Sequence, residues 1–168
     1  MSEKFGSWMT NAMDYWLSNK DLHNLRIRVF EDALQAVITR KPRTDWFGPR
    51  VVSYIVVESD GSYDLLDQLK AVGVQSVRLR SLSRTVFNSS IDEIYDLCLK
   101  QLKEYSADIL PNECIGCKWG DVCSAGHLPS RYSEANLFNN ASVYCEGIAS
   151  LLDASLCYME KVIDERRN

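Results

Sequence analysis

The chain contains, at residues 114–145, the segment CIGCKWGDVCSAGHLPSRYSEANLFNNASVYC, and this segment decides how the rest is interpreted. It places thiols at Cys114, Cys117 and Cys123 in a C-x2-C-x5-C pattern, and Cys145 follows after 21 intervening residues. Such short spacers let three thiolates wrap one face of a metal centre, and the glycines between them remove side-chain bulk where the backbone curls. Three local cysteines and one distant cysteine are typical of iron–sulfur sites, whereas zinc usually takes two close pairs. The spacing alone leaves both metals open.

The composition is that of a globular protein of about one domain. The chain has 168 residues, 46% apolar and 25% charged, which excludes a disordered or fibrous protein. Its net charge of −4 comes without a basic stripe, so we expect no nucleic-acid partner. The first residues, MSEKFGSWMTNAMDYW, lack the apolar core of a signal peptide, and no run approaches the roughly 18 apolar residues that span a bilayer. We therefore expect a cytoplasmic protein with no membrane partner, whose six cysteines are metal ligands or free thiols.

Hydrophobic periodicity predicts four helices. Apolar residues recur every three to four positions over 5–19, and again from Leu25 to Ile38 until Lys41-Pro42 stops the pattern. A third helix is expected over 90–105, because Ser90 and Glu93 have the spacing of a capping box. The last helix is expected over 142–166.

The middle of the chain predicts a small β-hairpin. Residues 51–58 are mostly β-branched or aromatic, and the turn-forming stretch 59–62 follows them. The return through 63–66 is a second strand or, from Asp64, the start of a short helix. We predict an α+β fold, with helices around a small antiparallel β-hairpin and a cysteine-rich metal-binding loop at 111–145. One domain is assigned to 1–168, with a helical lead-in over 1–48 and the hairpin over 51–66.

The cysteines outside the loop predict packing rather than chemistry. Cys98 and Cys157 lie inside helical patterns, and a free cysteine behaves as a small hydrophobe, so both are assigned to the core. Cys145 stands at the start of the last helix, where N–H groups favour an anion, so we expect its thiol pKa to be lowered.

Residue identities around the cysteines resemble a known family. The segment resembles the C-terminal SPASM domain of radical SAM peptide maturases, and most closely the cyclophane-forming group. The upstream residues 56–61 are similar to the strand and turn that precede the cysteine loop there, and the helix from Trp8 to Trp16 resembles the link that leaves the barrel. The matching positions in the loop are Pro129, Arg131, Tyr132, Ser133, Phe138, Asn139, Asn140, Ser142, Val143, Tyr144 and Cys145.

The resemblance implies one auxiliary [4Fe–4S] cluster, with zinc as the alternative metal. Family members carry two such clusters, and the ligands of the second map onto Cys114, Cys117, Cys123 and Cys145. The local cysteine that serves the first cluster falls on His127, which we interpret as a loop residue, and residues 50–97 contain no cysteine. The C-x3-C-x2-C triplet that radical SAM enzymes use to cleave S-adenosylmethionine is missing, and too few residues precede the loop to form a barrel.

The sequence therefore does not predict an enzyme that works by itself, and we assign no catalytic residue. The first function class is an accessory iron–sulfur module that docks a precursor peptide or relays an electron for a radical SAM enzyme. The alternative is a structural adaptor stapled by zinc or an iron–sulfur centre, with no redox role. The edge Val51–Glu58 is the expected peptide surface, unless the first helix covers it. Arg131 and Tyr132 are expected to brace the loop through hydrogen bonds to carbonyls.

Overall fold

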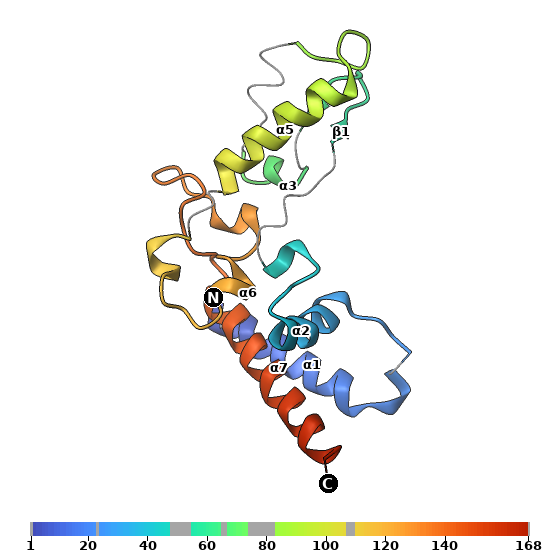
Figure 1. Ribbon diagram of the computed structural model, residues 1–168, viewed down its shortest axis with the longest axis vertical. Helices are drawn as coiled ribbons and strands as arrows, with labels where there is room; N and C mark the ends of the chain where they lie inside the picture. The colour runs from blue at the N-terminus through green and yellow to red at the C-terminus, as the bar shows by residue number, and fades with distance from the viewer. Residues whose placement is uncertain are drawn as a thin grey trace.

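The computed structural model describes residues 2–22, 24–47, 55–64, 67–73, 83–106 and 110–167. Helices dominate these residues, and two short strands form one antiparallel sheet (Figure 1). The elements in chain order are α1 (Ser2–Ser18), η1 (Lys20–Leu22), α2 (Arg28–Thr39), η2 (Asp45–Phe47), β1 (Val56–Val57), β2 (Tyr63–Asp64), α3 (Asp67–Lys70), α5 (Ile91–Ser106), η3 (Asn112–Cys114), α6 (Gly120–Cys123), η4 (Leu128–Arg131) and α7 (Cys145–Glu165). No helix in the described ranges has the length and apolar content needed to cross a membrane.

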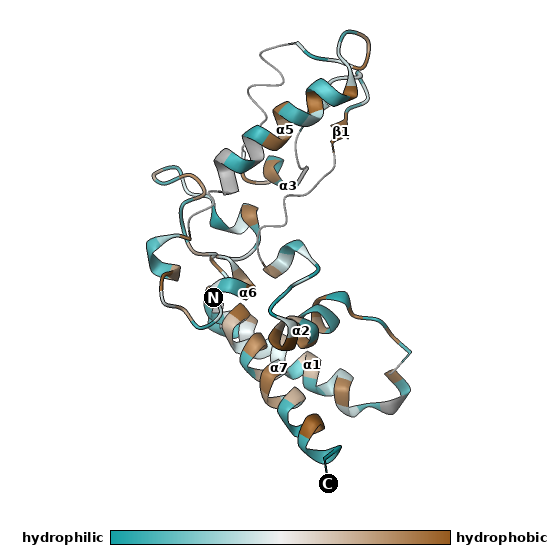
Figure 2. Cartoon of the chain, in the orientation of Figure 1, coloured by the Kyte–Doolittle hydropathy of each residue, from teal (hydrophilic) through white to brown (hydrophobic). Residues whose placement is uncertain are grey.

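Three helices, α1, α2 and α7, form a bundle at one end of the molecule (Figure 1). The first turns of α1 and α7 lie side by side, and a Cβ on Gly6 would lie 2.8 Å from the Cα of Gly147. Two turns further along, the Ser155 hydroxyl lies 3.4 Å from the Met13 sulfur, so α1 and α7 run parallel in close contact. Figure 2 shows hydrophobic positions gathered where the three helices meet. The buried side chains of this core include Met13, Phe30, Ala33, Phe47, Leu151 and Leu152.

The hairpin and α5 form the other end of the molecule (Figure 1). Val56 pairs with Asp64 and Val57 with Tyr63. The other edge of β2 is met by residues 84–86, because the Tyr63 N–H donates to the Arg84 carbonyl at 3.4 Å and the Val86 N–H donates to the Gly61 carbonyl at 2.9 Å. A second, smaller core lies here, made of Tyr63, Leu69, Ile94, Cys98 and Phe138.

Residues 110–144 connect the two cores. Trp119 directly precedes α6 and Val122 lies within it. Both side chains are buried in the bundle core. Phe138 is buried in the hairpin core, where its ring lies 5.4 Å from that of Tyr132. The segment that carries the cysteines is therefore held at both ends of the molecule.

The α+β fold class with a small antiparallel hairpin is confirmed. Residues 63–70 contain both of the elements that the sequence left open: the second strand, β2, ends at Asp64, and a short helix, α3, begins at Asp67. The capping interaction predicted at 90–93 is present, with the Glu93 N–H donating to the Ser90 hydroxyl at 3.3 Å. The predicted strand over 51–58 is described only from residue 55, and β1 occupies two residues of it.

The last helix begins at Cys145, later than the predicted position 142. Ser142 is engaged elsewhere, because its N–H donates to the Ala125 carbonyl at 3.0 Å and its hydroxyl accepts from the Tyr144 N–H at 3.0 Å. A residue tied to another segment in this way cannot continue the helical hydrogen-bond pattern toward the N-terminus.

Candidate metal centre

The four cysteines of the predicted site come together at one small pocket. Cys114 ends η3 and is buried, Cys117 follows in an exposed turn, Cys123 ends α6, and Cys145 opens α7. The rest of the pocket is lined by small residues, namely Gly120, Ala125, Ala141 and Ser142. Two segments separated by 21 residues in the sequence thus present their thiols to the same space.

Tight turns shape the first three positions. The Cys114 N–H donates to the Pro111 carbonyl at 2.8 Å, the Cys117 N–H to the Cys114 carbonyl at 3.2 Å, and the Gly120 N–H to the Cys117 carbonyl at 3.0 Å. Each bond closes over three residues, so the backbone curls around the pocket as the short spacers predicted. Gly120 lines the pocket, and a Cβ there would lie 3.4 Å from the Cys114 carbonyl oxygen.

A close backbone approach brings the fourth cysteine to the other three. Gly126 has φ +81°, and a Cβ on it would lie 2.8 Å from the Cβ of Ser142, so this position requires glycine. Ser142 is also fixed by the Ser130 hydroxyl, 2.8 Å from its own. The chain entering α7 is therefore pressed against the turn after α6, which places Cys145 beside the pocket.

Burial and mutual proximity raise the pKa values of three thiols at the site, Cys114, Cys123 and Cys145. Burial raises the pKa of Cys123 to about 12, and the neighbouring thiols of Cys145, Cys114 and Cys117 add to the increase. Burial also raises the pKa of Cys114, with smaller contributions from Cys145 and Cys117. Thiols in this setting stay protonated unless a cationic centre compensates, because the metal's positive charge is what favours thiolates.

The expected lowering of the Cys145 pKa is wrong. Burial raises the pKa of this thiol, and Cys117 and Glu146 raise it further. The favourable effect of the helix N-terminus is worth about 0.3–1 kcal/mol, and it is outweighed by desolvation together with the contributions of Cys117 and Glu146.

A buried charged side chain, Arg131, lies on the segment between the third and fourth cysteines. It is 3% exposed, its Nε donates to the Asn140 carbonyl at 3.2 Å, and its Nη2 is buried without a hydrogen-bond partner. The predicted brace to a carbonyl is present for Arg131, whereas Tyr132 instead packs its ring on Phe138. A buried cationic donor that lacks an acceptor, beside four thiols and small lining residues, fits a thiolate-ligated centre of net negative charge.

The four thiols share a pocket without meeting at one point. Within the described part of the chain, no three His, Cys, Asp or Glu side chains are arranged to hold a single metal ion. The four cysteines therefore line one pocket, but their side chains do not converge on the position of a single ion.

The remaining candidate residues lie away from the pocket. Cys98 is 2% exposed in the hairpin core, and burial raises its pKa to about 11, as its assignment to the core predicted. The assignment of Cys157 is wrong, because this thiol is exposed on the face of α7 opposite Ser155. His127 lies in the loop before η4, bonds to Gln68 of α3 at 3.0 Å and lies 3.4 Å from an Asp45 oxygen of η2.

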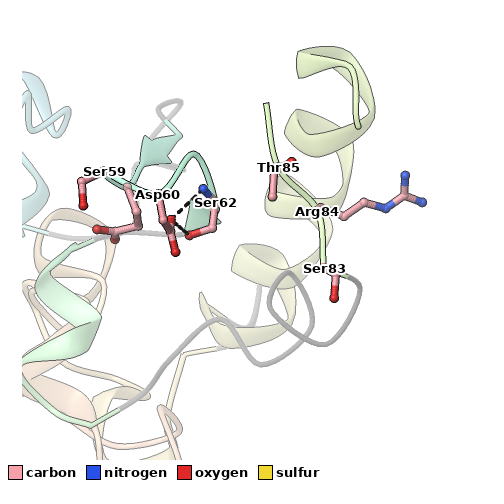
Figure 3. Close-up of a pocket in the computed structure, with 7 residues that line it drawn as sticks. Ser59, Asp60, Ser62, Ser83, Arg84 and Thr85 are labelled. Atoms are coloured by element: carbon pink, nitrogen blue, oxygen red, sulfur yellow. Dashed lines mark hydrogen bonds between the residues drawn. The ribbon is translucent and has the colours of Figure 1, made fainter. Parts of the chain in front are cut away.

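A second hollow, open and polar, lies at the hairpin turn (Figure 3). Its volume is about 430 Å³, and the Asp60 carboxylate on one wall accepts from the Ser62 N–H at 2.9 Å and the Ser62 hydroxyl at 2.6 Å. The opposite wall carries Arg84. No sequence pattern predicted this hollow, because it forms only when residues 83–85 meet the turn. The full lining is Glu58, Ser59, Asp60, Ser62, Ser83, Arg84 and Thr85.

Comparison with known sequences identifies sulfatase-maturating enzymes as relatives, although no family model matches the chain. The cysteine-type anaerobic sulfatase-maturating enzyme of Clostridium perfringens strain ATCC 13124 is 24% identical over 148 residues, which cover 84% of this chain and 37% of that enzyme. The enzyme of the same name from Clostridium novyi strain NT is 24% identical over 176 residues, which cover 98% of this chain and 43% of that enzyme. The chain therefore spans about two fifths of the length of the curated relatives it matches.

Solved structures share the fold. Native anSMEcpe with bound AdoMet and Kp18Cys peptide superposes on 98% of this chain and 44% of its own, with a TM-score of 0.74 and 18% identity. Native anSMEcpe with bound AdoMet gives a TM-score of 0.71 over 97% of this chain and 43% of its own, also at 18% identity. The chain is thus similar in sequence and fold to one section of a maturase. The cyclophane-forming group remains a prediction.

Proposed function

We propose that this chain is a SPASM-type iron–sulfur domain that serves a radical SAM enzyme in peptide maturation. Cys114, Cys117, Cys123 and Cys145 would hold one [4Fe–4S] cluster. The observation that carries the proposal is the single pocket lined by these four cysteines. It is supported by the similarity of 98% of the chain to a section of a sulfatase-maturating enzyme.

The residues around the pocket determine what such a site can do. When bound, a cluster with four cysteine ligands supplies one-electron transfer and offers no open iron to a substrate. The buried ring of Trp119, whose Nε1 donates to Asp153 at 2.8 Å, fixes the loop to α7. We therefore assign the site to electron relay or to support of the fold. The radical chemistry belongs to a partner or to another part of a longer protein.

We propose that the peptide docks at the hairpin end. β1 is the edge strand among the described strands, since β2 is flanked by β1 and by residues 84–86. The predicted alternative, cover by the first helix, is not supported, because α1 lies in the bundle (Figure 1). An exposed strand edge binds an extended peptide through backbone hydrogen bonds. The polar hollow beside it offers the Asp60 carboxylate to the side chains of such a peptide, whereas the Arg84 side chain points away from the hollow toward Ser89 and Glu93 (Figure 3).

The test of the cluster is anaerobic reconstitution followed by iron and sulfide analysis. The wild-type chain should hold about four iron and four sulfide, with absorbance near ~400 nm, as one complete set of ligands requires. Cys114→Ser should lose the centre, whereas Cys98→Ser, an equally buried thiol in the other core, and Cys157→Ser on the surface should retain it. Equal losses from Cys114→Ser and Cys98→Ser would contradict the assignment, and binding of zinc alone would favour the structural adaptor.

The test of the role is S-adenosylmethionine cleavage. The isolated chain under strong reductant should form no 5′-deoxyadenosine, because it lacks the three-cysteine loop that chelates this cofactor. A pull-down with a barrel-containing radical SAM protein and with short precursor peptides should then reveal the partner. Cleavage by the chain alone would overturn the accessory role.

A further inference from the structure

Arg131 carries a positive charge that the described structure leaves unneutralised. Its side chain is almost fully buried, and no carboxylate among the described residues forms an ion pair with it. Its Nη2 has no hydrogen-bond partner. Burying a guanidinium without a partner is costly, because the desolvation of a charged donor is not offset. A position that keeps such a group needs an acceptor that the protein atoms alone do not provide.

The guanidinium is held in place by a reciprocal pair of hydrogen bonds with Asn140. Arg131 Nε donates to the Asn140 carbonyl at 3.2 Å, and Asn140 Nδ2 donates to the Arg131 carbonyl at 2.8 Å. Asn140 directly precedes Ala141 and Ser142, which line the cysteine pocket. The Arg131 side chain is thus held by the segment 140–142, which also closes the pocket.

The residue before Arg131 is also tied to the pocket, because the Ser130 hydroxyl lies 2.8 Å from that of Ser142, which lines it, and the Val143 N–H donates to the Ser130 carbonyl at 2.9 Å. Burial lowers the pKa of the Arg131 guanidinium, and Cys114 and Cys123 act in the opposite direction. In turn, the Arg131 charge acts to lower the pKa of Cys114. These effects agree with a position of Arg131 near Cys114 and Cys123, both of which line the pocket.

We propose that Arg131 Nη2 donates a hydrogen bond to a sulfur of the centre held by the four cysteines and raises its reduction potential. The inference rests on the proposed cluster and adds a positioning residue to it. One electron from an external donor makes a thiolate-ligated centre more negative, and a fixed positive charge in a buried site stabilises that reduced form more than the oxidised form. Hydrogen bonds to cluster sulfur act in the same direction.

The experiment is a redox titration of the reconstituted wild type and of Arg131→Gln, followed by electron paramagnetic resonance. Arg131→Gln removes the charge, and we expect the ratio of reduced to oxidised centre at a fixed potential to fall by about tenfold, which is 59 mV for one electron. Arg131→Lys keeps the charge without the planar donor. Its reduction potential should lie between those of the wild type and Arg131→Gln. Arg26→Gln removes an equal charge from an exposed pair with Glu31 and should leave the potential unchanged.

The outcomes separate this inference from the cluster assignment. A wild-type chain that binds no iron and sulfide overturns the proposed function itself. A fully loaded Arg131→Gln chain with the wild-type potential overturns the role of Arg131 while leaving the cluster in place. If both Arg131 variants lose the centre but keep the helical circular dichroism of the wild type, Arg131 is a purely structural residue and the tuning role is wrong.

Discussion

The bundle end and the hairpin end of this molecule are stabilised by unequal cores. Three long helices bury a continuous set of side chains in the bundle, whereas the core described at the hairpin end consists of five buried residues around Ile94. The segment with the cysteines takes part in both, through Trp119 and Val122 on one side and Phe138 on the other.

The two cores hold different parts of the candidate metal site. The loop from Cys114 to Cys123 is tied to the larger core, and so is Cys145 at the start of α7. The turn that carries Arg131 is followed by Tyr132 and Phe138, which belong to the smaller core. The ligands and the charge that faces them therefore depend on different parts of the fold, and substitutions in the two cores should affect them separately.

The largest effect is expected from the bundle side. Trp119→Ala should lower the free energy of unfolding by about 3–5 kcal/mol, because it empties a fully buried aromatic site and removes the hydrogen bond to Asp153. Urea denaturation followed by circular dichroism measures this change. Trp119→Phe, which keeps most of the packing, should lower the free energy of unfolding much less. A cost below about 1 kcal/mol for the alanine variant would show that the loop is not anchored in the bundle.

A local effect is expected from the hairpin side. Phe138→Ala should raise hydrogen exchange of the amides in β2 and α5 by at least about tenfold, equivalent to about 1.4 kcal/mol, because it removes a buried ring from the core that these elements share. The amides of α1 and α7 should keep their protection. Leu137→Ala, at the exposed neighbouring position, serves as the control. Uniform loss of protection across the chain would mean that the two ends unfold as one unit.

A smaller effect is expected where α1 meets α7. Gly6→Ala places a Cβ 2.8 Å from the Gly147 backbone, so the helices must separate, at a cost of about 1–3 kcal/mol. The shift displaces the first turn of α7 and with it Cys145, so iron content after reconstitution should fall together with the melting temperature. Ser7→Ala, at an exposed position of the same helix, should change neither. Normal iron content at a lowered melting temperature would show that Cys145 is held independently of α1.

The smallest effect is expected from an exposed ion pair between the bundle and the loop. Arg40 donates a hydrogen bond to Asp121 that holds the pKa of this carboxyl below its ordinary value of 3.8. A lowered pKa contributes stability that is complete above 3.8 and is lost as the pH falls through the folded-state value. Asp121→Asn should therefore lower the free energy of unfolding at pH 7 by only about 0.2–1 kcal/mol, since salt and water screen an exposed pair. At strongly acid pH Asp121 is protonated in both states, so the substitution should have no effect. Thermal melts of both proteins across this range measure the difference, and a constant gap would contradict it.

The sequence by itself determined the features that depend on short-range patterns. The helical period predicted α2 and α5, the Ser90–Glu93 spacing predicted the start of α5, and the turn at Gly61 predicted the hairpin. The four cysteines were singled out by their spacing and by the resemblance of the segment around them. These signals work because a helix or turn is specified by residues within a few positions of one another.

Only the tertiary structure decided the features that depend on distant neighbours. The exposure of Cys157 and the raised pKa of Cys145 follow from which face of α7 meets α1 and from which groups surround its first turn. The unpartnered Nη2 of Arg131 is visible only once Asn140 has fixed the guanidinium beside the pocket. Burial, desolvation and charge–charge interaction act through space, so residues far apart in the chain determine them and no local pattern records them.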